Sequence, residues 1–247
     1  MRAVFPTMGT VASIDVPGRR AGDPIVRRLA ALFDEAESRF SLYCPDSELS
    51  QVARGELSLL DASVELRDAY SLAMDWHVRT DGAFTPNRPD GVVDLNGVVK
   101  AQCIAQASEL LRASAIADWS INVGGDIACA GDSGAGPWIA GIVNPDDRTA
   151  LLASVPLGPQ RHAVATSGSA ERGDHIWLFG QTTTAEFVQI TVVADDIVVA
   201  DVLATAIIAG GRPMLDRATD SWPIEVLAVT RDGALLATAG FRSPASA

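Results

Sequence analysis

The sequence predicts an α+β fold, in which mixed and largely antiparallel sheets pack against helices. Helical patterns dominate its first half, and short apolar strand patterns dominate its second half. Helices and strands that are separated in this way are typical of α+β proteins rather than of a regular βαβ repeat. The 247 residues can bury a sizeable core. Because no linker or internal repeat interrupts them, we expect a single domain or two interwoven lobes.

The first half begins with a strand and continues with three helices. Thr10 to Val16 alternates apolar and polar residues and predicts a strand that ends at Pro17-Gly18. Asp23-Pro24 predicts a helix start, because aspartate accepts from the first free amides and proline suits the first helical position. Periodic apolar residues then predict a second helix from about Asp61 to Arg79 and a third that begins near Asn96.

The second half reads as a series of strands and one strongly apolar helix. That helix is predicted from Asp196 to Ala209, and Gly210-Gly211 is expected to stop it. The predicted strands are short and apolar: Trp119 to Ala130, interrupted at Gly124-Gly125, Trp138 to Val143, Ala163 to Thr166, Val188 to Ala194, Ile224 to Thr230 and Ala234 to Ala239.

Composition argues against several classes of protein. The formal net charge of −12 repels polyanions, so nucleic acid is not an expected partner. We see no apolar run long enough to span a membrane and no secretory or lipoprotein signal, so we expect a cytoplasmic protein. The three cysteines are scattered without metal-ligand spacing and are expected to be reduced thiols.

The clearest pair of functional side chains lies on the apolar helix. Asp201 and Thr205 are four residues apart, so their oxygens project from one helix face about one turn from each other. A buried carboxylate is unfavourable unless it is paired or bound to a metal, and carboxylate and hydroxyl oxygens suit a Mg²⁺ ion that shares substrate phosphates. The alternative is an aspartate paired with an arginine and a threonine bonded to the preceding turn.

Two further segments carry groups that suit an anion. Lys100 is the one lysine among 19 basic residues, and it follows Asp94 at a predicted helix start, where free amides attract anions. The alternative there is a plain helix cap with a solvated lysine. Thr166 and Ser167 suit phosphate or ribose contacts, and His175, further along the same segment, could accept the proton of an attacking hydroxyl.

Two glycines, Gly124-Gly125, interrupt an apolar stretch. They predict either a bulge or a place where another group approaches the backbone closely. They do not form a dinucleotide fingerprint, and no P-loop, HExxH motif or Ser/His/Asp elbow is present in the sequence. None of these signals identifies a function alone.

A set of short stretches nevertheless stands in a recognisable order: Met8-Gly9-Thr10, Ser38 to Tyr43 with Pro45 to Ser50, Asp81 to Phe84, Asp94 to Lys100, Asn122 to Ile127, Ala165 to Gly168 with Arg172, His175-Ile176, and Ala200 to Thr205. In these stretches and their order, the chain resembles the FAD:protein FMN transferase family (ApbE-type, once filed under thiamine biosynthesis). The resemblance covers nearly the whole chain and implies one catalytic domain over residues 1–247, with a T-fold-like core.

The resemblance also implies a site. It implies a Mg²⁺ ion held by Asp201, Thr205 and the main-chain carbonyl of Val99, with His175 as base and Asp201 as a further catalytic residue. The residues it implies as FAD contacts are Met8, Tyr43, Ser47, Glu48, Asp94, Lys100, Thr166 and Ser167. The implied reaction transfers FMN from FAD onto a threonine or serine hydroxyl of an acceptor flavoprotein and releases AMP.

The chain departs from the family pattern near two of these positions. Ala101 and Gln106 stand where the family carries a glycine and an acidic residue, and Trp177 to Thr182 replaces an Asp-Pro-x-Thr-Gly turn after His175-Ile176. Two alternatives therefore stay open. One is an FAD-binding protein without transferase activity, and the other is a Mg²⁺-dependent FAD hydrolase, in which water attacks and FMN and AMP are released.

Overall fold

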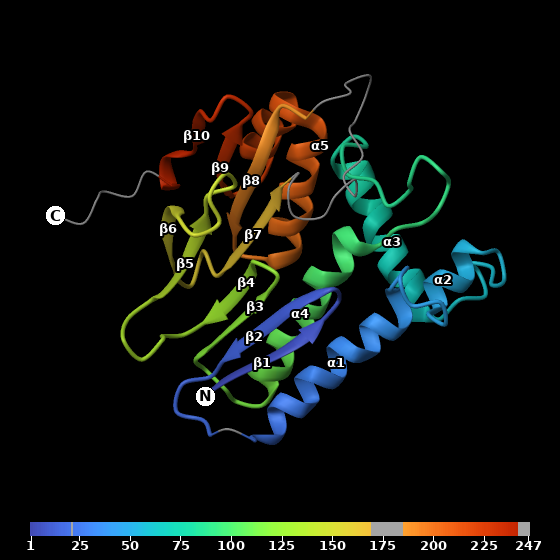
Figure 1. Cartoon of the computed structure of the whole chain (residues 1–247), viewed down its shortest axis with the longest axis horizontal. Coiled ribbons are helices and arrows are strands. Elements are labelled where there is room, and N and C mark those ends of the chain that lie inside the picture. The colour runs from blue at the N-terminus through green and yellow to red at the C-terminus, as the bar shows by residue number, and fades with distance from the viewer. Residues whose placement is uncertain (21, 169–184, 242–247) are drawn as a thin grey trace.

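A computed structural model describes residues 1–20, 22–168 and 185–241 and contains an antiparallel sheet of eight strands in the order β1-β2-β3-β4-β7-β8-β9-β10 (Figure 1). These strands are β1 Arg2–Thr7, β2 Thr10–Asp15, β3 Trp119–Val123, β4 Asp126–Ala130, β7 Ala163–Gly168, β8 Phe187–Ala194, β9 Glu225–Thr230 and β10 Leu235–Ala237. The other two described strands, β5 Trp138–Val143 and β6 Leu151–Leu157, form a separate hairpin. All strand pairs in the described residues are antiparallel, whereas the sequence predicted mixed and largely antiparallel sheets.

The helices are α1 Pro24–Phe40, α2 Glu48–Ala53, α3 Val64–Arg79, α4 Asn96–Ala113 and α5 Ile197–Ser221, with a short 3-10 helix, η1 Ala239–Phe241, near the end of the described chain. Helices α4 and α5 pack against one face of the large sheet, and α1 packs against α4 and β1 (Figure 1). The β5–β6 hairpin covers part of the opposite face, where it shares a small apolar cluster with β4, β7, β8 and β9. The α+β fold class is therefore confirmed.

Helix α1 begins as the sequence predicts. Asp23 is its N-cap, and the Asp23 carboxylate accepts a hydrogen bond from the Ile25 amide at 3.0 Å. Pro24 occupies the first helical position. The inner stripe includes Leu29 and Phe33, which are fully buried in the main core. Local capping and apolar periodicity are thus sufficient to position this helix.

Several predicted boundaries were wrong. Helix α3 begins at Val64 instead of Asp61, because the Ser63 hydroxyl caps it by accepting from the Leu66 amide at 3.3 Å. Helix α5 is interrupted as expected at Gly211, whose φ of 62° is not helical, but the chain then resumes a helix as far as Ser221. Strands β1 and β6 and helix α2 had not been predicted at all.

The glycine pair forms neither a bulge nor a gap in one strand. Gly124 and Gly125, with φ of 60° and 97°, make the tight turn between β3 and β4, in which Val123 pairs with Asp126. Positive φ at both central residues occurs in one common type of two-residue hairpin turn, and glycine adopts it without strain. The expected close approach is confirmed, because a β-carbon on Gly124 would lie 2.8 Å from the Thr10 hydroxyl oxygen.

Among the described residues, one helix is long and apolar enough to cross a membrane by length and composition, contrary to our expectation. This helix is α5, and 61% of its most apolar stretch is buried inside the protein. It packs against α4, β7 and β8, as the central helix of a globular core does. Length and composition alone are therefore weak evidence for a membrane span here.

Candidate functional site

Strand register gathers several predicted segments at one end of the large sheet. The β3–β4 turn lies against the β1–β2 turn, because the Gly124 amide donates to the Val11 carbonyl at 3.2 Å. The Thr166 amide, near the end of β7, donates to the Asp126 carboxylate at 3.2 Å. The Met8-Gly9 turn, the glycine turn and the end of β7 thus meet at this edge, which we call the site end of the sheet.

Three charged side chains meet beside the site end. Lys100 on α4 forms a direct ion pair with Asp126 at the start of β4. Its ammonium nitrogen also lies 3.9 Å from an oxygen of Asp201 on α5. The exposed fractions of the Lys100, Asp126 and Asp201 side chains are only 5%, 0% and 4%. We call these residues the Lys100 cluster. The cluster brings together two residues of the predicted site, Lys100 and Asp201. Because the Lys100 side chain is buried, the alternative of a solvated lysine was wrong.

Asp126 was missed by the sequence analysis. It lies in the Asn122 to Ile127 stretch, which was read for its glycines only. Its side chain faces the core, and its neighbour on the same face is the buried Ala128. A carboxylate on the buried face of a strand is unfavourable unless a cation or donors surround it. The signal in the sequence was therefore an aspartate two positions before Ala128, in the alternation that places side chains on the buried face of β4.

Hydroxyl groups connect β7 to its two neighbours. The Ser167 and Thr205 hydroxyl oxygens lie 3.1 Å apart, and this contact joins β7 to α5. The Thr166 and Thr191 hydroxyl oxygens lie 2.9 Å apart on the paired strands β7 and β8. Asp201 and Thr205 lie on α5, and the Lys100 ammonium lies 3.9 Å from a carboxylate oxygen of Asp201.

The donor chemistry of this region fits a Mg²⁺ ion. Carboxylate and hydroxyl oxygens, here those of Asp201, Thr205 and Ser167, are the hard ligands that Mg²⁺ prefers. Val99, the predicted carbonyl ligand, is buried next to Lys100 on α4. The described residues contain no group of three or more His, Cys, Asp or Glu side chains that could hold a metal by themselves. Such a site suits an ion that keeps water and substrate oxygens among its ligands.

Helix α4 begins at Asn96, as predicted, and its first turn is tightly packed. The Asp94 carboxylate accepts from the Asn96 amide at 3.0 Å, and the N-cap residue Leu95 makes no side-chain capping bond. A β-carbon at Gly97 would lie 2.7 Å from the ring of Phe84. Close approach of Phe84 therefore accounts for a glycine in this turn.

Met8 and Tyr43 lie at the turns that the sequence predicts as flavin contacts. Met8 has a φ of 47° in the β1–β2 turn, and its amide donates to the Glu37 carboxylate of α1 at 3.1 Å. Tyr43 follows α1 and is 75% exposed. An exposed aromatic side chain is available to a planar ligand, but the predicted flavin contacts stay predictions.

Ser47 and Glu48 have structural partners in the connection between α1 and α3. Ser47 is fully buried; its hydroxyl donates to the Ser41 carbonyl at 2.6 Å and accepts from the Ser50 amide at 3.0 Å. The Glu48 carboxylate accepts from the amide and hydroxyl of Ser63. Local folding therefore accounts for both residues, and their contact with FAD stays a prediction.

The buried thiols are not candidate nucleophiles. Burial raises the pKa of Cys103 and of Cys129 to about 12 from the ordinary 9.0. A thiol is nucleophilic as its thiolate, so both groups are inert near neutral pH. The predicted base, His175, lies outside the described residues, as do Arg172 and the altered turn that follows the histidine.

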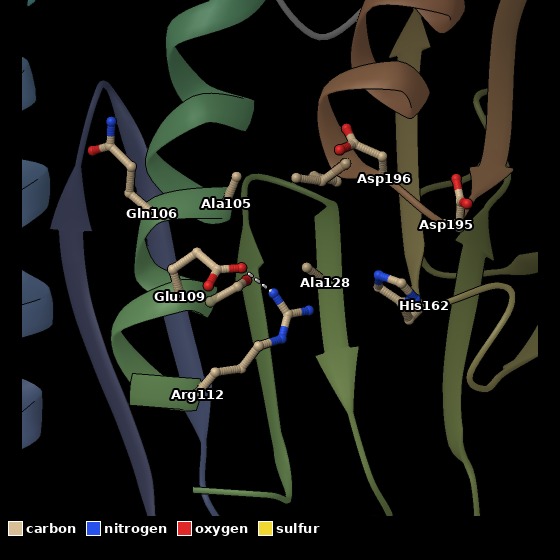
Figure 2. A pocket seen from close by; sticks show the side chains of 10 residues that line it. Ala105, Gln106, Glu109, Arg112, Ala128, His162, Asp195 and Asp196 are labelled. Carbon is tan, nitrogen blue, oxygen red and sulfur yellow. Dashed lines mark hydrogen bonds and ion pairs between the residues drawn. The ribbon is translucent and has the colours of Figure 1, made fainter. Parts of the chain in front are cut away.

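A cavity of about 400 Å³ lies at the opposite end of β7 and β8, between α4 and the start of α5 (Figure 2). Its described lining includes Glu109, Asp195 and Asp196, together with Arg112, which bonds to Glu109 at 2.6 Å. None of the described residues that line this cavity is among the residues predicted to contact FAD.

The chain is similar to known proteins in sequence and in fold. The sequence matches the ApbE family over residues 8–90 and 86–227. A FAD:protein FMN transferase from Klebsiella pneumoniae (strain 342) is 27% identical over 157 residues, which cover 59% of this chain. The chain spans 44% of the length of that relative.

Solved structures show the same fold. The flavin transferase ApbE from Vibrio cholerae superposes with a TM-score of 0.82 at 22% identity, over 98% of both chains. The flavinyl transferase ApbE from Pseudomonas stutzeri, in its apo form, gives 0.79 at 19% identity, over 98% of this chain and 95% of that one. An ApbE protein from Thermotoga maritima gives 0.78 at 17% identity, over 98% of both chains. With the family match extending over most of the chain and the fold shared across its length, this protein belongs to the ApbE family.

Proposed function

We propose that this protein is an FAD:protein FMN transferase, which moves FMN from FAD onto a threonine or serine hydroxyl of an acceptor protein and releases AMP. The observation that carries the proposal is the Lys100 cluster beside the Ser167–Thr205 contact. It combines a buried ammonium, two carboxylates and two hydroxyls, which are the groups that a metal-bound diphosphate requires. Family membership supports the proposal, as does the name of the Klebsiella pneumoniae relative.

FAD is an anion, and the net charge of the chain is −12. Binding must therefore depend on local groups at the site end. We assign the pyrophosphate and ribose part of FAD to Lys100, Thr166 and Ser167, with Asp94 at the start of α4. The ammonium and the hydroxyls are the groups that attract phosphate oxygens.

We assign the isoalloxazine ring to the turns at Met8 and Tyr43. The exposed ring of Tyr43 can stack on a planar heterocycle, and Met8 offers a polarizable side chain. Ser47 and Glu48 stabilise the segment that carries Tyr43, because their hydrogen bonds order the α1–α3 connection.

We assign a Mg²⁺ ion to Asp201, Thr205 and the main-chain carbonyl of Val99. When bound, the ion supplies charge neutralisation on the pyrophosphate and on the leaving group. Asp201 provides the one carboxylate of this set, so it determines whether the ion is held. Water and phosphate oxygens complete the ligand shell.

The transfer step follows from these assignments. The acceptor hydroxyl oxygen forms a bond to the FMN-side phosphorus, and the bond from that phosphorus to the bridging oxygen breaks. AMP leaves with the bridging oxygen and its electron pair. His175 takes the hydroxyl proton, which is a contribution of about 10²–10⁴-fold for a general base. The remaining acceleration comes from positioning and charge stabilisation.

The test is to incubate the protein with FAD, Mg²⁺ and candidate acceptor flavoproteins. The proposal predicts that an acceptor gains the mass of one FMN and that one AMP appears for each FMN attached. Bound FAD without AMP would favour a flavin-binding protein without transferase activity. Equal amounts of AMP and free FMN, with no acceptor modified, would favour an FAD hydrolase.

A further inference from the structure

Lys100 lies between two carboxylates, and the proposed function uses only one of them as a metal ligand. The ammonium contacts Asp126 directly and lies 3.9 Å from Asp201. We propose that Asp126 is a positioning residue that holds Lys100 back from Asp201, so that the ammonium does not compete with a divalent cation for the Asp201 carboxylate. The inference rests on the proposed metal site and extends it to a residue that binds neither the metal nor the reacting atoms.

The geometry makes Asp126 a fixed anchor. It is the first residue of β4, directly after the tight Gly124-Gly125 turn, and it is fully buried. One of its oxygens accepts the Thr166 amide at 3.2 Å, and the other pairs with Lys100. With one oxygen tied to β7, the carboxylate cannot follow the ammonium if the ammonium moves toward α5.

Lys100, by contrast, has a side chain that can move. Its ammonium is a compact charge on a flexible four-carbon stem, so a small rotation changes which carboxylate it contacts. An ammonium in direct contact with Asp201 would occupy a ligand oxygen and would repel a divalent cation at the same place. Asp126 prevents this competition because it provides the closer, fixed partner.

Two substitutions separate this role from a merely structural one. Asp126→Asn removes the charge but keeps an oxygen that can accept the Thr166 amide, so Lys100 loses its anchor and turns to Asp201. Asp126→Asn combined with Lys100→Met removes the competing ammonium as well. Replacing both members of a buried ion pair by uncharged groups of similar volume is generally tolerated. Asp15→Asn, on β2, is the matched control because Asp15 lies outside the cluster.

The measurement is a Mn²⁺ titration of the FAD-free protein followed by electron paramagnetic resonance, because Lys100 is itself assigned to the phosphates of FAD. We expect Asp126→Asn to weaken Mn²⁺ binding about tenfold or more, in the range seen when partners of metal ligands are lost. We expect the double variant to return to within about threefold of the natural protein and the control to bind normally. Equal binding by the natural protein and Asp126→Asn overturns the proposal, and so does a double variant that binds as weakly as the single one.

A second measurement needs no metal. Because Lys100 is the chain's one lysine, protein grown with ¹³C-labelled lysine gives a single lysine side-chain signal in an NMR spectrum. We expect that signal to move in metal-free Asp126→Asn and to stay in place in the Asp15→Asn control. An unmoved signal in Asp126→Asn overturns the proposal.

The remaining outcomes also decide the question. If Asp126→Asn does not fold, the double variant decides alone: Mn²⁺ affinity within about threefold of the natural protein supports the proposal, and a larger loss overturns it. If the natural protein itself fails to bind Mn²⁺, the proposed metal site is wrong and the inference falls with it. Normal binding by the natural protein and by Asp126→Asn contradicts the positioning role alone.

Discussion

The hydroxyl oxygens of Ser167 and Thr205 lie 3.1 Å apart, although the two residues are 38 positions apart in the sequence. Ser167 lies at the end of β7, in the segment that we assign to the phosphates of FAD. Thr205 lies on α5, one turn from Asp201, in the segment that we assign to Mg²⁺. This contact therefore joins the proposed substrate site to the proposed metal site, and both can be tested residue by residue.

Thr205→Val removes a hydroxyl ligand while it keeps the shape of the side chain. We expect Mn²⁺ binding to weaken about tenfold or more, because a hard cation cannot use a methyl group in place of an oxygen. Thr219→Val is the matched control, because Thr219 lies on the same helix and its hydroxyl donates to the Leu215 carbonyl at 3.1 Å. If both variants bind Mn²⁺ like the natural protein, Thr205 is not a ligand.

Tyr43→Ala tests the assignment of the isoalloxazine ring. Loss of one aromatic contact should raise the dissociation constant for FAD by up to about tenfold, as stacking contributes about 0.5–1.5 kcal/mol. The thermal midpoint should change little, because Tyr43 is 75% exposed. Leu60→Ala, at a position that is 81% exposed, is the control. Unchanged FAD affinity in Tyr43→Ala would place the ring elsewhere.

Gly97→Ala tests the packing at the start of α4. The added methyl group would lie 2.7 Å from the Phe84 ring, which is 3% exposed and cannot move freely. We expect the free energy of unfolding in urea to fall by about 1–3 kcal/mol, the usual cost of overpacking. Gly158→Ala is the control, because no heavy atom lies within 4 Å of a β-carbon added there. Equal stability of the two variants would show that Phe84 yields without cost.

Alkaline pH should weaken the fold through the buried thiols. Burial raises the pKa of Cys103 and Cys129 to about 12, whereas unfolded thiols titrate near 9.0. Their contribution to stability is therefore complete below pH 9.0 and is lost as pH rises toward 12. We expect the free energy of unfolding to fall more steeply with pH in the natural protein than in a Cys103→Ala, Cys129→Ala variant. Parallel pH profiles would contradict this expectation.

The sequence predicted those elements whose signals are local. The cap at Asp23-Pro24 predicted α1, and a short apolar run predicted β5 with its observed bounds, Trp138–Val143. Strand β6, Leu151–Leu157, was missed because it has only two buried residues and includes Pro156, which is uncommon inside a strand. Helix α2, Glu48–Ala53, has six residues, too few for a helical period to be visible.

In the candidate site too, the sequence predicted what depends on local signals and missed what depends on tertiary contacts. Asp201 and Thr205 could be paired from the sequence because one helix carries both. Asp126 could not be paired with Lys100, because their meeting depends on how α4 crosses the start of β4. A tight turn at Gly124-Gly125, not a bulge, begins β4 at Asp126. Tertiary packing and turn chemistry thus determined what sequence patterns alone had left open.

The most direct test of the proposed transfer is a quantitative assay of AMP release and acceptor labelling by the natural protein and by Asp201→Asn, with FAD, Mg²⁺ and an acceptor. Asp216→Asn, at an exposed position of the same helix, is the control. We expect one AMP per FMN attached with the natural protein and the control, and at least about a hundredfold loss in Asp201→Asn, because a bound metal contributes several kcal/mol to such a step. Full activity in Asp201→Asn would contradict the account.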